Sequence, residues 1–152
     1  MAKEPHPEDE LEQGARVFQQ DNLQFAYGNI FDDIFPAGSF GVITINSCLQ
    51  YFEDAPALLS RLMELLRDDG RIFIIDSPFY APEQVADANK RSQEYYAQLG
   101  FPEMSANYFH HTKEELEGFD AAVVYDPNSM RNRAKRLTGQ IDSPFPMVRI
   151  AK

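Results

Sequence analysis

The chain has 152 residues, enough for one domain with a core of its own, and 43% of them are hydrophobic, an ordinary share for a globular protein. Its 24 acidic residues outnumber 14 basic ones, and the net charge of −10 argues against nucleic acid as a partner. No apolar run is long enough for a membrane span and the acidic start does not resemble a signal peptide, so we expect a cytoplasmic protein without membrane contact.

The N-terminal part predicts a flexible tail over residues 1–10, followed by a single domain over residues 11–152. Apolar residues at spacings of four and three predict a helix over Glu8–Phe18. Apolar and polar residues then alternate over Leu23–Tyr27, a pattern typical of a half-buried strand.

The middle of the chain predicts a strand–helix–strand unit. The β-branched run Phe40–Ile45 indicates a strand buried on both faces. Asp54 is placed to cap a leucine-rich helix, and Gly70 to end it. Arg71–Asp76 predicts a second buried strand. Because the connections are short, we expect the two strands to be parallel.

A long helix is predicted over Pro82–Leu99, with Gly100 at its C-terminus. Thr112 is followed three residues later by Glu115, the spacing of a capping box. The pair predicts a short helix that ends near Gly118.

Two last strands, Ala121–Tyr125 and Pro146–Ala151, predict an antiparallel hairpin at the end of the sheet. The connection between them is basic. It could hold an anionic ligand or form a solvated loop or helix face, and its cations are Arg131, Arg133, Lys135 and Arg136.

Three segments, in this order, resemble the second part of a class I S-adenosylmethionine-dependent methyltransferase. They are GNIFDDIFPAGSFGVITINSCLQYF, LLRDDGRIFIIDSPFY and HHTKEELEGF. The resemblance implies an α/β, truncated Rossmann-like fold with a mostly parallel sheet and a C-terminal antiparallel hairpin. It also implies S-adenosylmethionine as cofactor and a small-molecule acceptor. A flavodoxin-like domain is the alternative fold, but the chain has no phosphate-binding first turn.

The family's glycine-rich turn and the acidic residue that takes the ribose would precede residue 8, and the eight glycines are scattered singly. We therefore expect a truncated cofactor site and weak or no cofactor binding by this chain. The resemblance assigns the remaining cofactor-facing positions to Asn29, Ile30, Asn46 and Ser47.

The ends of the two parallel strands and the aromatic stretch after them are where the family builds its acceptor pocket. Ligands of open α/β sheets lie beyond the carboxyl ends of the strands. The candidate acceptor-binding residues are Tyr51, Phe79, Tyr80, Tyr95, Tyr96 and Tyr108.

His110, His111 and Asp76 are the candidates for a catalytic base, although no catalytic residue is fixed by the sequence. Adjacent histidines point in different directions, so at most one should face a pocket. The alternative for Asp76, and the favoured one, is that it caps the helix after its strand. We expect no metal site, and the single cysteine, Cys48, to be a buried, inert thiol.

Two functions remain open: a methyltransferase acting on a small molecule, and a catalytically inactive methyltransferase-like domain that binds a ligand or assembles with itself. Without the family's first strand, Phe40–Ile45 would form an exposed apolar sheet edge. We expect a homodimer that buries this edge.

Overall fold

The computed structural model describes residues 7–139 and 143–152, in two compact units divided after residue 34. The first unit contains α1 (Pro7–Val17) and an irregular segment. The helix confirms the prediction for Glu8–Phe18, shifted by one residue at each end.

The strand predicted over Leu23–Tyr27 is wrong, because this segment is irregular. Phe25 and Tyr27 are 40% and 59% exposed. Within the described part of the chain no strand pairs with the segment, so its backbone has no neighbouring strand with which to form the hydrogen bonds of a sheet. The Phe25 ring packs against Gly14 of α1 instead. Residues 1–6 of the predicted tail lie outside the described residues.

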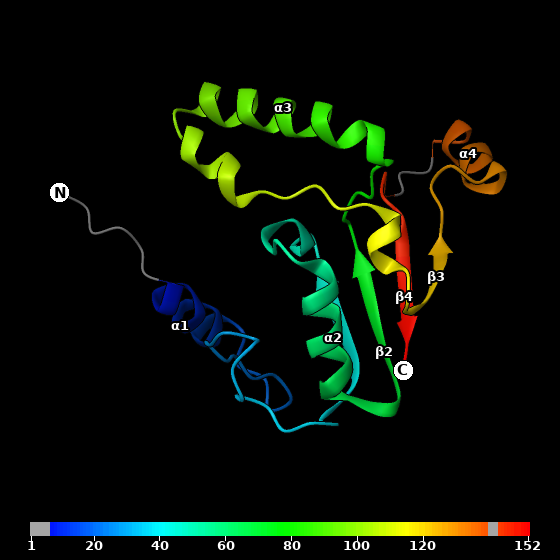
Figure 1. The fold of residues 1–152 in the computed structure, drawn as a ribbon. Helices are drawn as coiled ribbons and strands as arrows, with labels where there is room; N and C mark the ends of the chain where they lie inside the picture. Colours follow the sequence, from blue (N-terminus) through cyan, green and yellow to red (C-terminus); the bar gives the residue numbers. More distant parts are fainter. Residues whose placement is uncertain (1–6, 140–142) are drawn as a thin grey trace. The chain divides into compact units, whose positions relative to one another are not determined.

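The second unit is built on a sheet with the strand order β1-β2-β4-β3 (Figure 1). Its strands are β1 (Phe40–Asn46), β2 (Leu66–Ile75), β3 (Asp120–Tyr125) and β4 (Met147–Ala151). The parallel β1–β2 pair and the antiparallel β3–β4 hairpin confirm the predictions. Since β2 and β4 are also antiparallel, only one of the three strand pairs in the described residues is parallel, and the expectation of a mostly parallel sheet needs that correction.

Helix α2 (Ala55–Leu65) begins as predicted, because the carboxylate of Asp54 accepts a hydrogen bond from the Ala57 amide at 2.8 Å. The predicted end at Gly70 is wrong. Leu66 is already extended and pairs with Phe40, so the chain enters β2 directly after the helix. Gly70 lies buried inside β2, where the register with β1 shifts.

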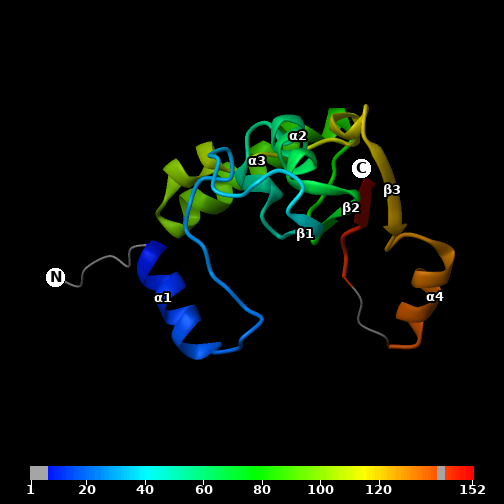
Figure 2. The ribbon, with the colours of Figure 1, turned by 90° about the horizontal axis from the view of Figure 1, so that it is seen from below.

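One face of the sheet and α2 form the core. It contains Ile45, Leu58, Leu59, Leu62, Leu65, Ile72, Ile74, Val148 and Ile150, all less than 5% exposed. Figure 2 shows α2 on one side of the sheet. Val42 points to the other face and is 58% exposed, so the prediction that Phe40–Ile45 is buried on both faces is wrong.

Helix α3 (Pro82–Leu99) has the predicted bounds and lies beyond the carboxyl ends of β1 and β2 (Figure 1). It ends at Gly100, whose φ of +85° suits glycine. One-turn 3-10 helices, η1 (Leu49–Tyr51) and η3 (Lys113–Leu116), and the longer η2 (Pro102–Asn107) complete this edge.

The predicted capping box at the start of η3 is present, since the Thr112 amide donates to Glu115 Oε1 at 2.8 Å. The helix ends at Leu116. The basic connection of the hairpin forms α4 (Met130–Leu137), and its arginines are exposed. None of the helices in residues 7–139 and 143–152 is long and apolar enough to cross a membrane.

Candidate functional site

The carboxyl ends of β1 and β2 are joined through two residues with left-handed backbones. Ser47 has a φ of +52° and Asp76 a φ of +51°. The Ser47 amide donates to the Ile75 carbonyl at 3.0 Å, and Ser47 Oγ donates to the Asp76 carbonyl at 3.5 Å. Such strain in residues other than glycine concentrates at ligand sites.

The Asp76 side chain neither caps a helix nor faces solvent freely. The residue before α3 is Ala81, and Asp76 Oδ1 accepts a hydrogen bond from Ser143 Oγ at 2.5 Å. The carboxylate thus ties the end of β2 to the segment that leads into β4. The helix-capping alternative for Asp76 is therefore wrong.

The candidate cofactor-facing residues lie in both units. Asn46 and Ser47 are exposed at the end of β1. Asn29 and Ile30 belong to the first unit, where Asn29 Oδ1 accepts from the Phe31 amide at 3.1 Å. An exposed amide and hydroxyl at a strand end can hydrogen-bond nucleoside hydroxyl and amino groups, so Asn46 and Ser47 fit one wall of a cofactor site.

A cavity of about 220 Å³, here called the tyrosine pocket, lies between α3 and the segment after η2. It is lined by Tyr80, Ala88, Arg91, Ser92, Tyr95, Tyr96, Tyr108 and His110. The Tyr96 and Tyr108 ring centroids are 5.9 Å apart. Tyr51 meets Tyr108 edge-to-face at the same distance. Five of the six candidate acceptor residues thus belong to one group of rings.

Two backbone hydrogen bonds hold the strip that carries Tyr108 and His110. The Phe109 amide donates to the Gln50 carbonyl at 2.8 Å, and the Tyr80 amide donates to the His111 carbonyl at 2.9 Å. The strip is therefore fixed between η1 and the chain that follows β2. On the other side of the pocket, Ser92 and Tyr96 lie one turn apart on α3.

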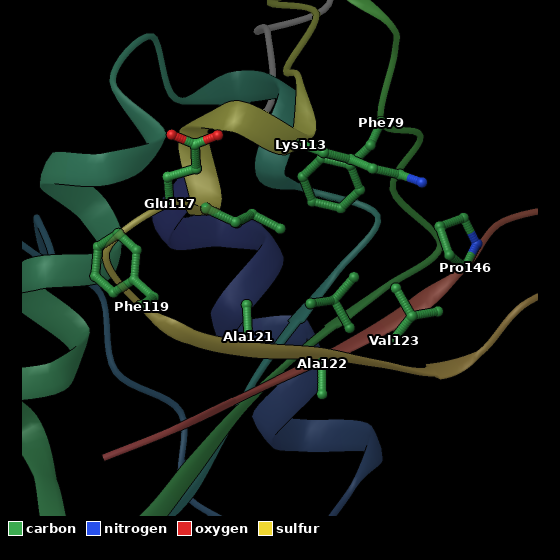
Figure 3. Close-up of a pocket in the computed structure, with 10 residues that line it drawn as sticks. Phe79, Lys113, Glu117, Phe119, Ala121, Ala122, Val123 and Pro146 are labelled. Carbon is green, nitrogen blue, oxygen red and sulfur yellow. The ribbon is translucent and has the colours of Figure 1, made fainter.

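The sixth acceptor candidate, Phe79, lies elsewhere. It lines a separate apolar pocket of about 250 Å³ between η3 and the β3–β4 hairpin (Figure 3). Ala121 and Val123 of β3 form its floor, and Lys113 and Glu117 stand at its rim. Phe79 and Tyr80 are neighbours in sequence and were both predicted to bind the acceptor, but they line different pockets.

His110 makes side-chain hydrogen bonds through both ring nitrogens. Nδ1 lies 2.8 Å from Asn89 Oδ1, and Nε2 lies 3.1 Å from Ser92 Oγ. Because an amide oxygen can only accept, Nδ1 carries the proton, and Nε2 accepts from the Ser92 hydroxyl. Burial, with Arg91 and His111 nearby, lowers the pKa of His110, so the ring is neutral at neutral pH.

His111 points away from the pocket, as adjacent histidines should, and is only 4% exposed. Its Nε2 lies 3.1 Å from the Leu49 carbonyl oxygen, and its Nδ1 lies 2.8 Å from Glu115 Oε2. These bonds tie η3 to η1. His111 is thus a structural histidine beside the pocket.

Burial raises the pKa of the Tyr96 and Tyr108 hydroxyls. The neighbouring Tyr80, Tyr96 and Tyr51 raise the pKa of Tyr108 further. Cys48 is partly buried, and burial raises the pKa of its thiol, which keeps it unreactive. Within the described ranges, no three His, Cys, Asp or Glu side chains gather as metal ligands would.

Asn89, Arg91 and Ser92 were not among the candidates from the sequence. A signal for Asn89 and Ser92 was nonetheless present, because these two residues and Tyr96 recur at helical spacings of three and four on α3. A polar residue on the same face as a predicted pocket tyrosine is itself a pocket candidate.

The family described as "Methyltransferase domain" matches residues 6–74. Nocamycin O-methyltransferase of Saccharothrix syringae is 49% identical over 45 residues, which are 30% of this chain and 16% of that protein. This chain thus matches only a small part of that curated relative.

Solved structures share the fold over most of the chain. A chain of the complex between the Haloferax volcanii Trm112 methyltransferase activator and a methyltransferase has a TM-score of 0.59 and 13% identity, covering 94% of this chain and 67% of its own. A SAM-dependent methyltransferase of Thermotoga maritima has a TM-score of 0.53 and 14% identity, with 93% and 70% covered. The plantazolicin methyltransferase BpumL, solved with a substrate analogue and SAH, has a TM-score of 0.53 and 16% identity, with 92% and 62% covered.

The chain is thus similar to a methyltransferase domain over residues 6–74, and it shares its fold with solved methyltransferases.

Proposed function

We propose that this protein is an S-adenosylmethionine-dependent methyltransferase acting on a small molecule, and that the tyrosine pocket holds the acceptor. The observation that supports this is the meeting of Tyr80, Tyr95, Tyr96 and Tyr108 around one cavity beyond the carboxyl ends of β1 and β2. Ligands of open α/β sheets bind at that edge. The aromatic walls would orient a flat acceptor, and orientation supplies much of the rate of a displacement reaction.

S-adenosylmethionine, when bound, supplies a methyl group on a positively charged sulfur. On the described chain, Asn46 and Ser47 would line the side of the cofactor that faces the end of β1. The Asp76–Ser143 hydrogen bond would hold the end of β2 in place beside them. The acceptor would then lie between this strand edge and α3.

The test is methyl transfer from methyl-labelled S-adenosylmethionine to a panel of hydroxyl, amine and thiol acceptors. Tyr108→Ala should lower the transfer rate about 10- to 100-fold, because the acceptor loses its alignment, while the Kd for the cofactor changes little. Phe79→Ala, in the other pocket, is the control and should leave the rate near that of the unaltered protein. Transfer that resists Tyr108→Ala would contradict this acceptor site.

A second candidate function is a catalytically inactive domain that binds a ligand or assembles with itself. The exposed edge strand β1 favours it, because within the described residues only β2 pairs with β1. Calorimetric titration with S-adenosylmethionine discriminates the two. Micromolar affinity supports the enzyme, whereas no heat at millimolar cofactor supports the inactive domain.

A further inference from the structure

Hydrogen bonds join Asn89, His110 and Ser92 into a chain with one open end, and His110 and Ser92 of this chain line the tyrosine pocket. Asn89 Oδ1 accepts from His110 Nδ1, and His110 Nε2 accepts from Ser92 Oγ. Both ring nitrogens are therefore engaged, and the ring has no free atom to offer a ligand. The Ser92 oxygen still has its lone pairs, and Ser92 lines the cavity.

A hydroxyl in the pocket can complete this chain. A serine hydroxyl that donates to histidine can accept a hydrogen bond from a second hydroxyl at the same time. When the proton of that second hydroxyl passes to Ser92 Oγ, the Ser92 proton passes to His110 Nε2. One proton leaves the ligand oxygen and one arrives on the His110 ring. The Nδ1 proton of the resulting imidazolium stays hydrogen-bonded to Asn89 Oδ1. The ligand oxygen gains the negative charge and His110 the positive charge.

The size and walls of the pocket favour a flat ring as the ligand. A cavity of about 150 Å³ is enough for benzene, so the 220 Å³ here accepts one ring with a substituent. Four tyrosines line it, and aromatic pairs with centroids 4.5–7 Å apart contribute about 0.5–1.5 kcal/mol beyond the area they bury.

The charge of the pocket argues against a cation. Four aromatic rings could form a cage for an ammonium group. However, Arg91 lines the same cavity and carries a permanent positive charge. Its field also contributes to the lowered pKa of His110. An amine would meet this charge, whereas a carboxylate substituent would be attracted to it.

We propose that the tyrosine pocket binds a planar hydroxyaryl compound, favouring one with an anionic substituent, and that Ser92 relays the proton of its hydroxyl to His110, which Asn89 positions. This inference rests on the proposed function because it names the acceptor class of the same pocket. Ser92 touches the ligand, whereas Asn89 acts only through His110.

The test is equilibrium binding to the full chain without cofactor, with 4-hydroxybenzoate, benzoate and tyramine as probes. We expect 4-hydroxybenzoate to bind about 3- to 10-fold more tightly than benzoate, the effect of one added hydrogen bond, and more tightly than tyramine. In Ser92→Ala, the affinities for 4-hydroxybenzoate and benzoate should become nearly equal, with a ratio close to one. Ser60→Ala, which removes a serine hydroxyl on α2 that donates to the Pro56 carbonyl, should leave the ratio unchanged.

Nitrogen NMR of His110 provides a readout that a purely structural role would not change. The free chain should show the proton on Nδ1, and 4-hydroxybenzoate should shift the Nε2 resonance. Asn89→Asp places a carboxylate beside Nδ1 and should raise the pKa of His110. An Nε2-protonated ring in the free chain would overturn the relay.

Three further results would overturn the proposal: equal binding of benzoate and 4-hydroxybenzoate, tightest binding of tyramine, or no binding of any probe at millimolar concentration. Binding in the expected order without methyl transfer would instead refute the proposed function and leave this inference standing. Methyl transfer to amines alone would refute this inference and leave the proposed function standing.

Discussion

At the scale of single residues, hydrogen-bond partners decide what each side chain of the pocket can do. His110 and His111 are neighbours in sequence, yet His110 lines the pocket and His111 is buried against Glu115 and Leu49. Only the first has a partner, Ser92, that also reaches the cavity. The two histidines could not have been assigned from residue type, because their partners lie up to 62 positions away.

The lowered pKa of His110 predicts how stability depends on pH. In the folded chain this pKa lies below its ordinary 6.5, so below about pH 6.5 the unfolded chain binds more protons at this site. The free energy of unfolding should therefore rise with pH between the folded-state pKa and about 6.5, because below the folded-state pKa both states are protonated at this site. The charged and titratable groups around His110 are Arg91, His111, Tyr80 and Tyr108.

Urea unfolding of the chain and of His110→Gln at pH 5 and pH 7.5 checks this. The loss of stability on acidification should be smaller in the variant, because carboxylates contribute equally to both proteins. Identical losses would show that His110 has the same pKa in the folded and unfolded states.

At the scale of elements, the junction of α2 and β2 shows a helix passing directly into a strand. The pairing of Leu66 with Phe40 ends the helix earlier than its sequence suggests. Gly70 is then needed for packing. A Cβ there would lie 2.9 Å from the Arg67 carbonyl oxygen and 2.9 Å from Leu66 Cδ2.

Two glycines in the paired strands give a matched test of this packing. Gly70→Ala should lower the free energy of unfolding by about 1–3 kcal/mol, the usual effect of overpacking. A Cβ added at Gly41 of β1 would meet nothing within 4 Å, and Gly41 has no positive φ, so Gly41→Ala should change stability by less than about 1 kcal/mol. Chemical denaturation measures both, and equal effects would remove the packing role of Gly70.

At the scale of the whole molecule, the exposed edge of strand β1 favours pairing with a strand of another chain. Val42 is 58% exposed on it, and within the described part of the chain its outer side has no strand partner. Exposed apolar edges pair readily with another chain. We propose that the protein forms a homodimer through β1.

Sedimentation at micromolar concentration tests the dimer. Val42→Lys should produce monomers, because a lysine on the edge opposes strand pairing. Val124→Lys is the matched control, since Val124 is 48% exposed on β3 at the opposite edge of the sheet. A monomeric unaltered protein, or equal dissociation by both variants, would refute an interface at β1.

The features that could be predicted from the sequence are those whose causes are local. The Asp54 cap, the bounds of α3 and the Thr112–Glu115 capping box all depend on residues a few positions apart. Such contacts form in almost any fold that keeps the segment together. The predicted group of pocket tyrosines also came from the sequence, through the resemblance to a family.

The tertiary structure alone decided what depends on distant partners. Leu23–Tyr27 has a strand pattern but no neighbour to pair with, and Leu66 leaves its helix because Phe40 lies beside it. Ser92 and His110 meet across 18 positions, and Asp76 meets Ser143 across 67. A hydrogen bond between side chains so far apart depends on how the elements pack, and no local pattern in the sequence encodes that geometry.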